Sequence, residues 1–150
     1  MASWGAGSFE NDTAMDWLSA LTADNAVDPV VEALEAVLED TGVVNERSSC
    51  EALAAAELVA ALNPEEATVL PDEVHRWLKR QKLKPTGQLV RLAKAAVKQV
   101  GSENSELCKH WQSAVRGGRE WACLIDDLAA RLDYDAVEAS ALSSRWWRLW

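Results

Sequence analysis

The chain is organised around its beginning, which reads Trp4-Gly5-Ala6-Gly7-Ser8-Phe9-Glu10-Asn11-Asp12-Thr13-Ala14-Met15-Asp16-Trp17-Leu18. Gly5 and Gly7 let the backbone take positive φ or press closely on a neighbouring segment. Trp4 and Phe9 flank these glycines. We expect both aromatic side chains to be buried in the core, each contributing about 3 kcal/mol of stability. The sequence therefore predicts a tight segment, the glycine turn of residues 4–10, that is packed on the core.

A helix follows this turn directly. Asn11, Asp12 and Thr13 are all favourable N-cap residues, and Thr13 with Asp16 resembles a capping box that has Asp in place of Glu. The predicted helix runs from about Asp12 to Leu21. Its apolar face is expected to carry four residues at helical spacing: Ala14, Trp17, Leu18 and Leu21.

The motif from Trp4 to Asp16, Trp-Gly-x-Gly-x-Phe-x-Asn-Asp-x-Ala-x-Asp, resembles the opening of a bacterial family known only as domain of unknown function 4259. The Ala-rich segment 52–62 and the segment 124–132, Leu-Ile-Asp-Asp-Leu-Ala-Ala-Arg-Leu, are similar to that family too. The resemblance covers residues 1–132. It implies a fold and a bacterial origin, and it implies no activity.

Length and composition indicate one globular core. The chain has 150 residues, 49% of them hydrophobic, which suffices for one well-buried core. It contains no apolar run of about 18 residues that could span a membrane, and its first residues lack the pattern of a signal peptide. Three cysteines without a Cys-x-x-Cys motif indicate a reducing compartment, so we expect a cytoplasmic protein.

Charge is distributed unevenly along the chain. Residues 1–73 carry sixteen acidic residues and one basic residue, and the whole chain has a net charge of −9. Residues 74–100 carry no acidic residue and eight basic ones: Arg76, Lys79, Arg80, Lys82, Lys84, Arg91, Lys94 and Lys98. This basic stretch is interpreted as a solvated surface, with an acidic protein partner as the alternative. Nucleic acid is not expected as a partner because the remaining surface would repel it.

Apolar spacing and breaking residues predict six further helices. They begin near Asp28-Pro29, at a capping box of Ser48 and Glu51, at Pro71, at Thr86, before Leu107 and after Gly117-Gly118. The expected core includes Leu38 of the second helix, and Asp127 and Arg131 of the last form an i, i+4 pair. We predict an all-α fold, a compact orthogonal bundle of about seven short helices. Residues 1–132 form a single domain, and residues 133–150 form an extension.

Glu57 is the most informative single residue. It shares a helix face with Leu53, Ala54, Leu58 and Ala61, so it is expected near the core, where a carboxylate must be paired or hydrogen-bonded. The main interpretation is that Glu57 accepts N–H groups from the glycine turn and holds it in place. The alternatives are a solvated carboxylate at the edge of the face and a catalytic carboxylate.

Other polar residues are given structural roles. Glu10, Asp12 and Asp16, with Asp126 as a further member, could hold a cation or perform acid–base chemistry, but capping and solvation explain first-turn acids better. The glycine turn matches no phosphate-binding fingerprint. Cys108 and His110 have no second ligand pair at zinc spacing, and Cys50 and Cys123 are expected to be small core residues. We therefore predict no metal and no cofactor.

The end of the chain is rich in tryptophan and arginine. The residues expected to bind a partner are Arg145, Trp146, Trp147, Arg148 and Trp150. Packing back on the domain and contact with a membrane surface are the alternatives.

The sequence favours a non-enzymatic protein–protein interaction module, with an inhibitor or immunity-like role by analogy with other small acidic bacterial proteins. Its partner would be another protein or a second copy of the chain. The rival hypothesis is a carboxylate- or metal-dependent enzyme whose site lies near the glycine turn, beside Asp12, Asp16 and Glu57. The structural or ligand candidates at the turn are Trp4, Gly5, Gly7, Phe9, Asn11, Asp12, Asp16 and Glu57.

Overall fold

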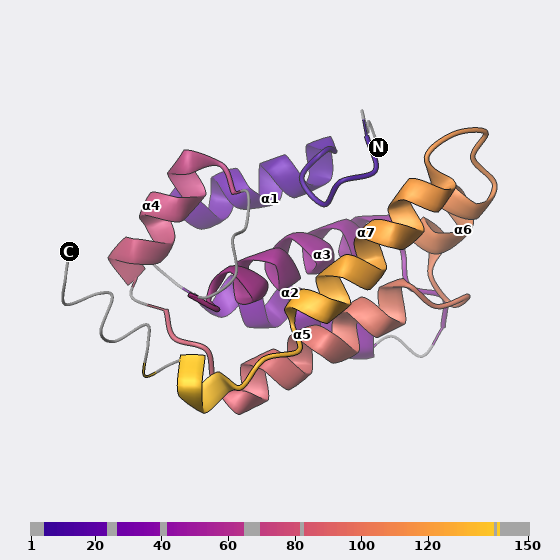
Figure 1. The fold of residues 1–150 in the computed structure, drawn as a ribbon. Helices are drawn as coiled ribbons and strands as arrows, with labels where there is room; N and C mark the ends of the chain where they lie inside the picture. The colour runs from indigo at the N-terminus through magenta and orange to yellow at the C-terminus, as the bar shows by residue number, and fades with distance from the viewer. Residues whose placement is uncertain are drawn as a thin grey trace.

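The computed structural model describes residues 5–23, 27–39, 42–64, 70–81, 83–139 and 141. These residues contain the helices α1 (Asp12–Ala23), α2 (Asp28–Glu39), α3 (Glu46–Ala61), α4 (Asp72–Gln81), α5 (Gly87–Val100), α6 (Glu106–Gln112) and α7 (Gly118–Arg131). Residues 136–139 add a helical turn. Figure 1 shows these helices gathered into one bundle, which confirms the predicted all-α class and its compactness. Trp4 and the tail residues 145–150 lie outside the described residues.

Helix α3 is the centre of the bundle. It contacts α1, α2, α5, α6 and α7, and Figure 1 shows it running through the middle of the molecule. Its small side chains let these neighbours approach closely. Five alanines of α3 are fully buried: Ala52, Ala54, Ala55, Ala56 and Ala60. A helix that is apolar on nearly all sides is one enclosed by other elements, and α3 fits this rule except at the edge that carries Glu57.

Asparagine begins two of the helices, and this corrects both predicted capping boxes. Asn11 Oδ1 accepts the N–H of Ala14 at 2.8 Å, so α1 starts one residue after Asn11. Asn45 Oδ1 accepts the N–H of Ser48 at 2.8 Å, which places Ser48 inside the first turn of α3. In both cases an asparagine that precedes the predicted cap in the sequence is an equally good N-cap, so the helix begins there.

The buried faces follow the predicted spacing with two exceptions. Trp77 of α4 is fully buried. Leu38 is 40% exposed, because it lies at one edge of the buried α2 face, whereas Ala33 at the opposite edge is buried. Cys123 is exposed, since it lies about 200° around α7 from the buried Trp121. The predictions of core positions for Leu38 and Cys123 are therefore wrong.

The segment after α7 packs on the bundle. The Tyr134 hydroxyl donates to the carbonyl oxygen of Val59 at 2.8 Å, and burial raises the Tyr134 pKa. Ala136 is buried in the same core. The ammonium of Lys94 donates to Asp133 at 3.0 Å, so one member of the basic stretch is paired with this segment. No described helix is long and apolar enough to cross a membrane.

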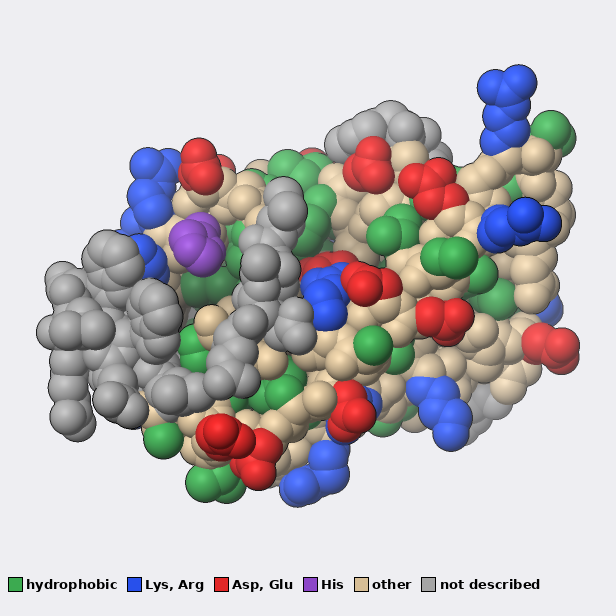
Figure 2. All heavy atoms as spheres, viewed as in Figure 1, with side chains coloured by type: hydrophobic (Ala, Val, Ile, Leu, Met, Phe, Trp, Pro, Cys, Tyr) green, Lys and Arg blue, Asp and Glu red, His purple; other side chains and the backbone are tan. Residues whose placement is uncertain are grey.

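The surface in Figure 2 mixes acidic, basic and hydrophobic side chains, with basic groups at the right-hand edge where the α6–α7 loop projects. Val115 in this loop is 99% exposed, and Arg116 and Arg119 beside it are exposed as well.

The three thiols are expected to differ sharply in reactivity. Burial, aided by the nearby Glu46 and Glu51 carboxylates, raises the pKa of Cys50 to about 12, so its reactive thiolate is scarce at neutral pH. Ellman's reagent should modify only Cys123 quickly in the native protein and all three cysteines in denaturant. The Cys123→Ser variant should show no fast phase. Fast labelling of Cys50 or Cys108 in that variant would contradict the packing described.

Candidate functional site

Glu57 and Arg131 form a partly buried ion pair between α3 and α7. Arg131 Nη1 donates to Glu57 Oε2 at 2.8 Å, and Nη2 donates to Oε1 at 3.1 Å. The two side chains are 13% and 17% exposed. Such a two-point contact fixes the relative orientation of both groups. The hydrogen bond to Glu57 is also the main cause that raises the pKa of Arg131, which keeps the guanidinium charged.

The same pair reaches the glycine turn. Ser8 Oγ donates to Glu57 Oε1 at 3.0 Å, and Arg131 Nε donates to Asp127 Oδ2 at 2.8 Å. The structure thus brings Glu57 to the turn, through the Ser8 hydroxyl and not through the predicted backbone N–H groups. The predicted i, i+4 pair of Asp127 and Arg131 is present. Sequence reasoning missed that Arg131 also pairs with Glu57, although both are charged residues beside apolar helix faces.

Glu10 closes the glycine turn on itself. The N–H of Gly7 donates to Glu10 Oε1 at 3.0 Å, and the N–H of Glu10 donates to the Gly7 carbonyl at 3.0 Å. A Cβ atom on Gly5 or Gly7 would meet the Glu10 carboxylate, so close approach and not positive φ explains these glycines. Ala6 is buried in the core. Phe9 is partly buried and packs against the core. The turn is therefore attached to the body at several points.

The other carboxylates considered for a cation site lie on two helices. Asp12 and Asp16 are exposed on α1, and Asp126 is exposed on α7. Within the described ranges, no three or more His, Cys, Asp or Glu side chains are grouped so that they could hold a metal ion. His110 Nδ1 lies 3.8 Å from Glu46 Oε1, and His75 is exposed on α4.

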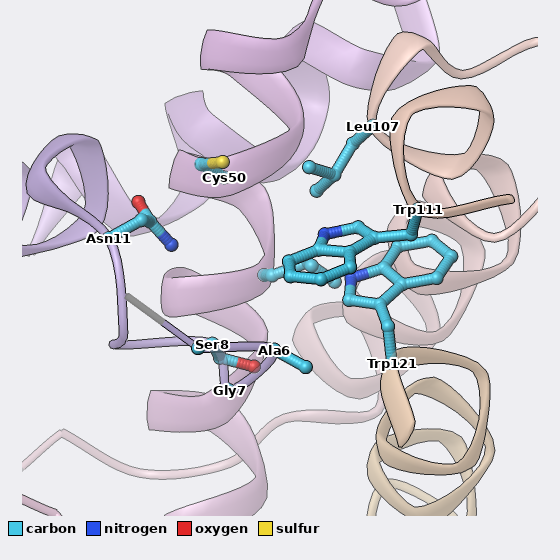
Figure 3. Close-up of a pocket in the computed structure, with 10 residues that line it drawn as sticks. Ala6, Gly7, Ser8, Asn11, Cys50, Leu107, Trp111 and Trp121 are labelled. Carbon is cyan, nitrogen blue, oxygen red and sulfur yellow. The ribbon is translucent and has the colours of Figure 1, made fainter. Parts of the chain in front are cut away.

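A pocket opens between the glycine turn and helices α3, α6 and α7 (Figure 3). Its cavity volume is about 10 Å³, which is room for about one water molecule. The residues that line it are Gly5, Ala6, Gly7, Ser8, Asn11, Cys50, Leu53, Leu107, Trp111 and Trp121. Three of the candidate positions, Gly5, Gly7 and Asn11, thus meet at this pocket. Ser8, which donates to Glu57, lines it as well.

Two tryptophans from the second half of the chain complete this pocket. Trp111 of α6 is half-buried and Trp121 of α7 is buried. Gly117 has a φ of 89°, and a Cβ atom there would lie 2.6 Å from the Trp111 ring, so glycine permits the turn that brings the indoles together. Trp111 lies four residues after Leu107, and Trp121 lies three before Leu124, so helical spacing alone puts each tryptophan on an apolar face. Nothing in the sequence signals that these faces meet the glycine turn.

Removal of Glu57 should destabilise the domain. Glu57→Ala leaves Arg131 without its partner, and we expect the free energy of unfolding to fall by about 2–3 kcal/mol, somewhat below the cost for fully buried pairs. Asp127 is the matched control, since its side chain is 61% exposed. Asp127→Ala should cost under about 1 kcal/mol. Urea unfolding measures the stability of both variants. The same measurement on Arg131→Ala and on the double variant Glu57→Ala/Arg131→Ala gives the interaction energy between Glu57 and Arg131. A Glu57→Ala protein as stable as the wild type would contradict a structural role.

Comparison with known proteins identifies the family. The model of the family described as domain of unknown function (DUF4259) matches residues 2–123. Searches of the curated proteins and of the solved structures gave no significant match. The matched range includes the glycine turn, Glu57 and both pocket tryptophans, and it ends before Arg131. The chain therefore belongs to the DUF4259 family.

Proposed function

We propose that this domain is a non-enzymatic binding module that presents an acidic helix face to a basic protein. The face lies on α2, where Glu32, Glu35 and Glu39 are exposed at i, i+3 and i+7. Leu38 beside them is 40% exposed, and Val43 just after the helix is 45% exposed. This combination of exposed carboxylates on one helix with exposed apolar side chains beside and after them is the single observation that carries the proposal.

Physical chemistry supports a protein partner for such a face. Carboxylates steer a basic partner during diffusion and set its orientation, while the neighbouring exposed apolar side chains supply area that is removed from water on contact. The net charge of −9 adds a long-range attraction for basic proteins. An inhibitor or immunity-like protein, which covers the basic surface of another protein, is the role that this chemistry suits. The Arg145–Trp150 tail is proposed as a second contact, because Trp and Arg are frequent at interface hot spots.

Charge reversal on α2 tests the proposal. A partner captured from the source cells is identified, and its affinity is then measured for the wild type and for the triple variant E32K/E35K/E39K. We expect the triple variant to bind about 100-fold more weakly than the wild type, mainly because it associates more slowly. The association rate of the wild type should fall as salt is added.

The control is a second triple variant, E103K/E120K/D126K, which makes the same change of net charge at exposed positions on other elements. It should bind within about threefold of the wild type, since distant charges act only through screened long-range attraction. Equal loss of affinity in both variants would show that only the net charge matters. Unchanged affinity of the α2 variant would refute the proposed face.

A further inference from the structure

The basic helix α5 lies beside the acidic helix α2. Both helices pack on α3 and on each other (Figure 1), and their outer sides face solvent. Val44 and Ser105 form an isolated bridge, and each of them follows the end of its helix, α2 or α5, by five residues. The two helices therefore run in the same direction and end close together.

The outer side of α5 carries a basic row, Arg91 and Lys98. Both residues are exposed, and the exposed Ala95 lies between them. They are seven residues apart, which is two helical turns, so the two cations stand on one side of α5, about 10 Å apart along its axis. The acidic row on α2 begins at Glu32 and ends at Glu39, which are also seven residues apart. The two rows thus have opposite charge and equal spacing.

Neither row is paired within the molecule. In the described part of the chain, no ion pair or hydrogen bond engages a charged side chain of either row. Lys94 of the same helix differs, because it donates to Asp133. Both rows point away from α3, so they lie next to each other on one surface and do not face each other. A second molecule that carries the same two rows can face both of them at once.

We propose that this chain forms a two-fold symmetric dimer in which α2 of each copy lies on α5 of the other. A two-fold axis parallel to the helices turns this surface over and exchanges the places of α2 and α5, so each acidic row meets a basic row. Such an axis leaves positions along the helices almost unchanged. Glu39 ends α2, and Lys98 lies two residues before the end of α5, so these two residues of opposite copies come together. Glu32 is placed near Arg91 in the same way.

The surface suits a small, reversible interface. Ala36 and Ala95 are exposed between the charges and allow two helices to approach closely. Two neighbouring helices of this length cover about 400 Å², which is at the small end of specific interfaces and predicts exchange with the monomer at micromolar concentrations. Repulsion between two chains of charge −9 is screened beyond about 8 Å at physiological ionic strength, whereas the paired rows are closer than that. The same surface is used on both copies, so assembly stops at two.

The dimer names one partner for the acidic face and in that respect rests on the proposed function. A second copy and a basic protein compete for α2, so the dimer keeps the acidic face covered until such a protein binds. The two interactions are separable by mutation, because the basic protein does not need Arg91 or Lys98.

Light scattering of the full chain tests the dimer. At about 0.15 M salt and from about 10 to 500 μM protein, we expect the mass of the wild type to rise from one chain towards two. The variants E32K/E39K and R91E/K98E should associate with themselves at least about 100-fold more weakly, because like charges then face each other. The control E120K/D126K changes the net charge as E32K/E39K does, at exposed positions on α7, and should dimerise as the wild type does.

Two combinations should restore the dimer. In an equal mixture of E32K/E39K and R91E/K98E, every acidic row again meets a basic row, so the two variants should form a dimer of one copy each. The quadruple variant E32K/E39K/R91E/K98E exchanges the two rows and keeps the net charge of the wild type, so it should dimerise with itself. All substituted positions are exposed, and melting curves establish that each variant is folded.

The opposite results overturn the dimer. A wild type that stays monomeric over this range of concentration would refute it. Reversal variants that dimerise like the wild type, or a mixture or quadruple variant that stays monomeric, would refute the contact between α2 and α5. Loss of the dimer in E120K/D126K would show that only net charge matters. The proposed function fails separately, when the basic protein captured from cells binds E32K/E35K/E39K as tightly as the wild type.

Discussion

The Glu57–Arg131 pair is the contact on which the arrangement around the glycine turn depends. It joins the central helix α3 to α7, and Glu57 also receives the Ser8 hydroxyl of the turn. Three segments far apart in the sequence are thus fixed by one carboxylate. A charge in such a partly enclosed place must be paired, because its desolvation is unfavourable without a partner. The requirement for pairing therefore determines where α7 and the turn lie on α3.

The packing of α3 makes this arrangement possible. Its alanines bring five neighbouring helices close to its axis, so that short side chains such as Ser8 can reach across to Glu57. The isolated bridge between Val44 and Ser105 aligns the starts of α3 and α6. The N–H of Val44 donates to the carbonyl of Asn104 at 2.8 Å, and the carbonyl of Val44 accepts the N–H of Glu106 at 2.9 Å. Fixing α6 and α7 in this way brings Trp111 and Trp121 to the glycine turn. The pocket is a consequence of these packing constraints.

The acidic face and the pocket have different physical origins. The acidic face on α2 belongs to one helix, and the spacing of Glu32, Glu35 and Glu39 places them together without help from the rest of the fold. The pocket draws its walls from the turn and from α3, α6 and α7. A change in the acidic face therefore need not alter the pocket.

The sequence by itself determined the helical class, most helix ends, the pair of Asp127 and Arg131, and the attachment of the glycine turn to a body that contains Glu57. These features depend on residues close in sequence, or on a single buried charge that demands a partner. Only the tertiary structure decided that the partner is Arg131, that Asn11 and Asn45 are the caps in use, and that Trp111 and Trp121 face Asn11. Such choices depend on how helices pack against one another, and helical periodicity says which face is apolar without saying which other face it will meet.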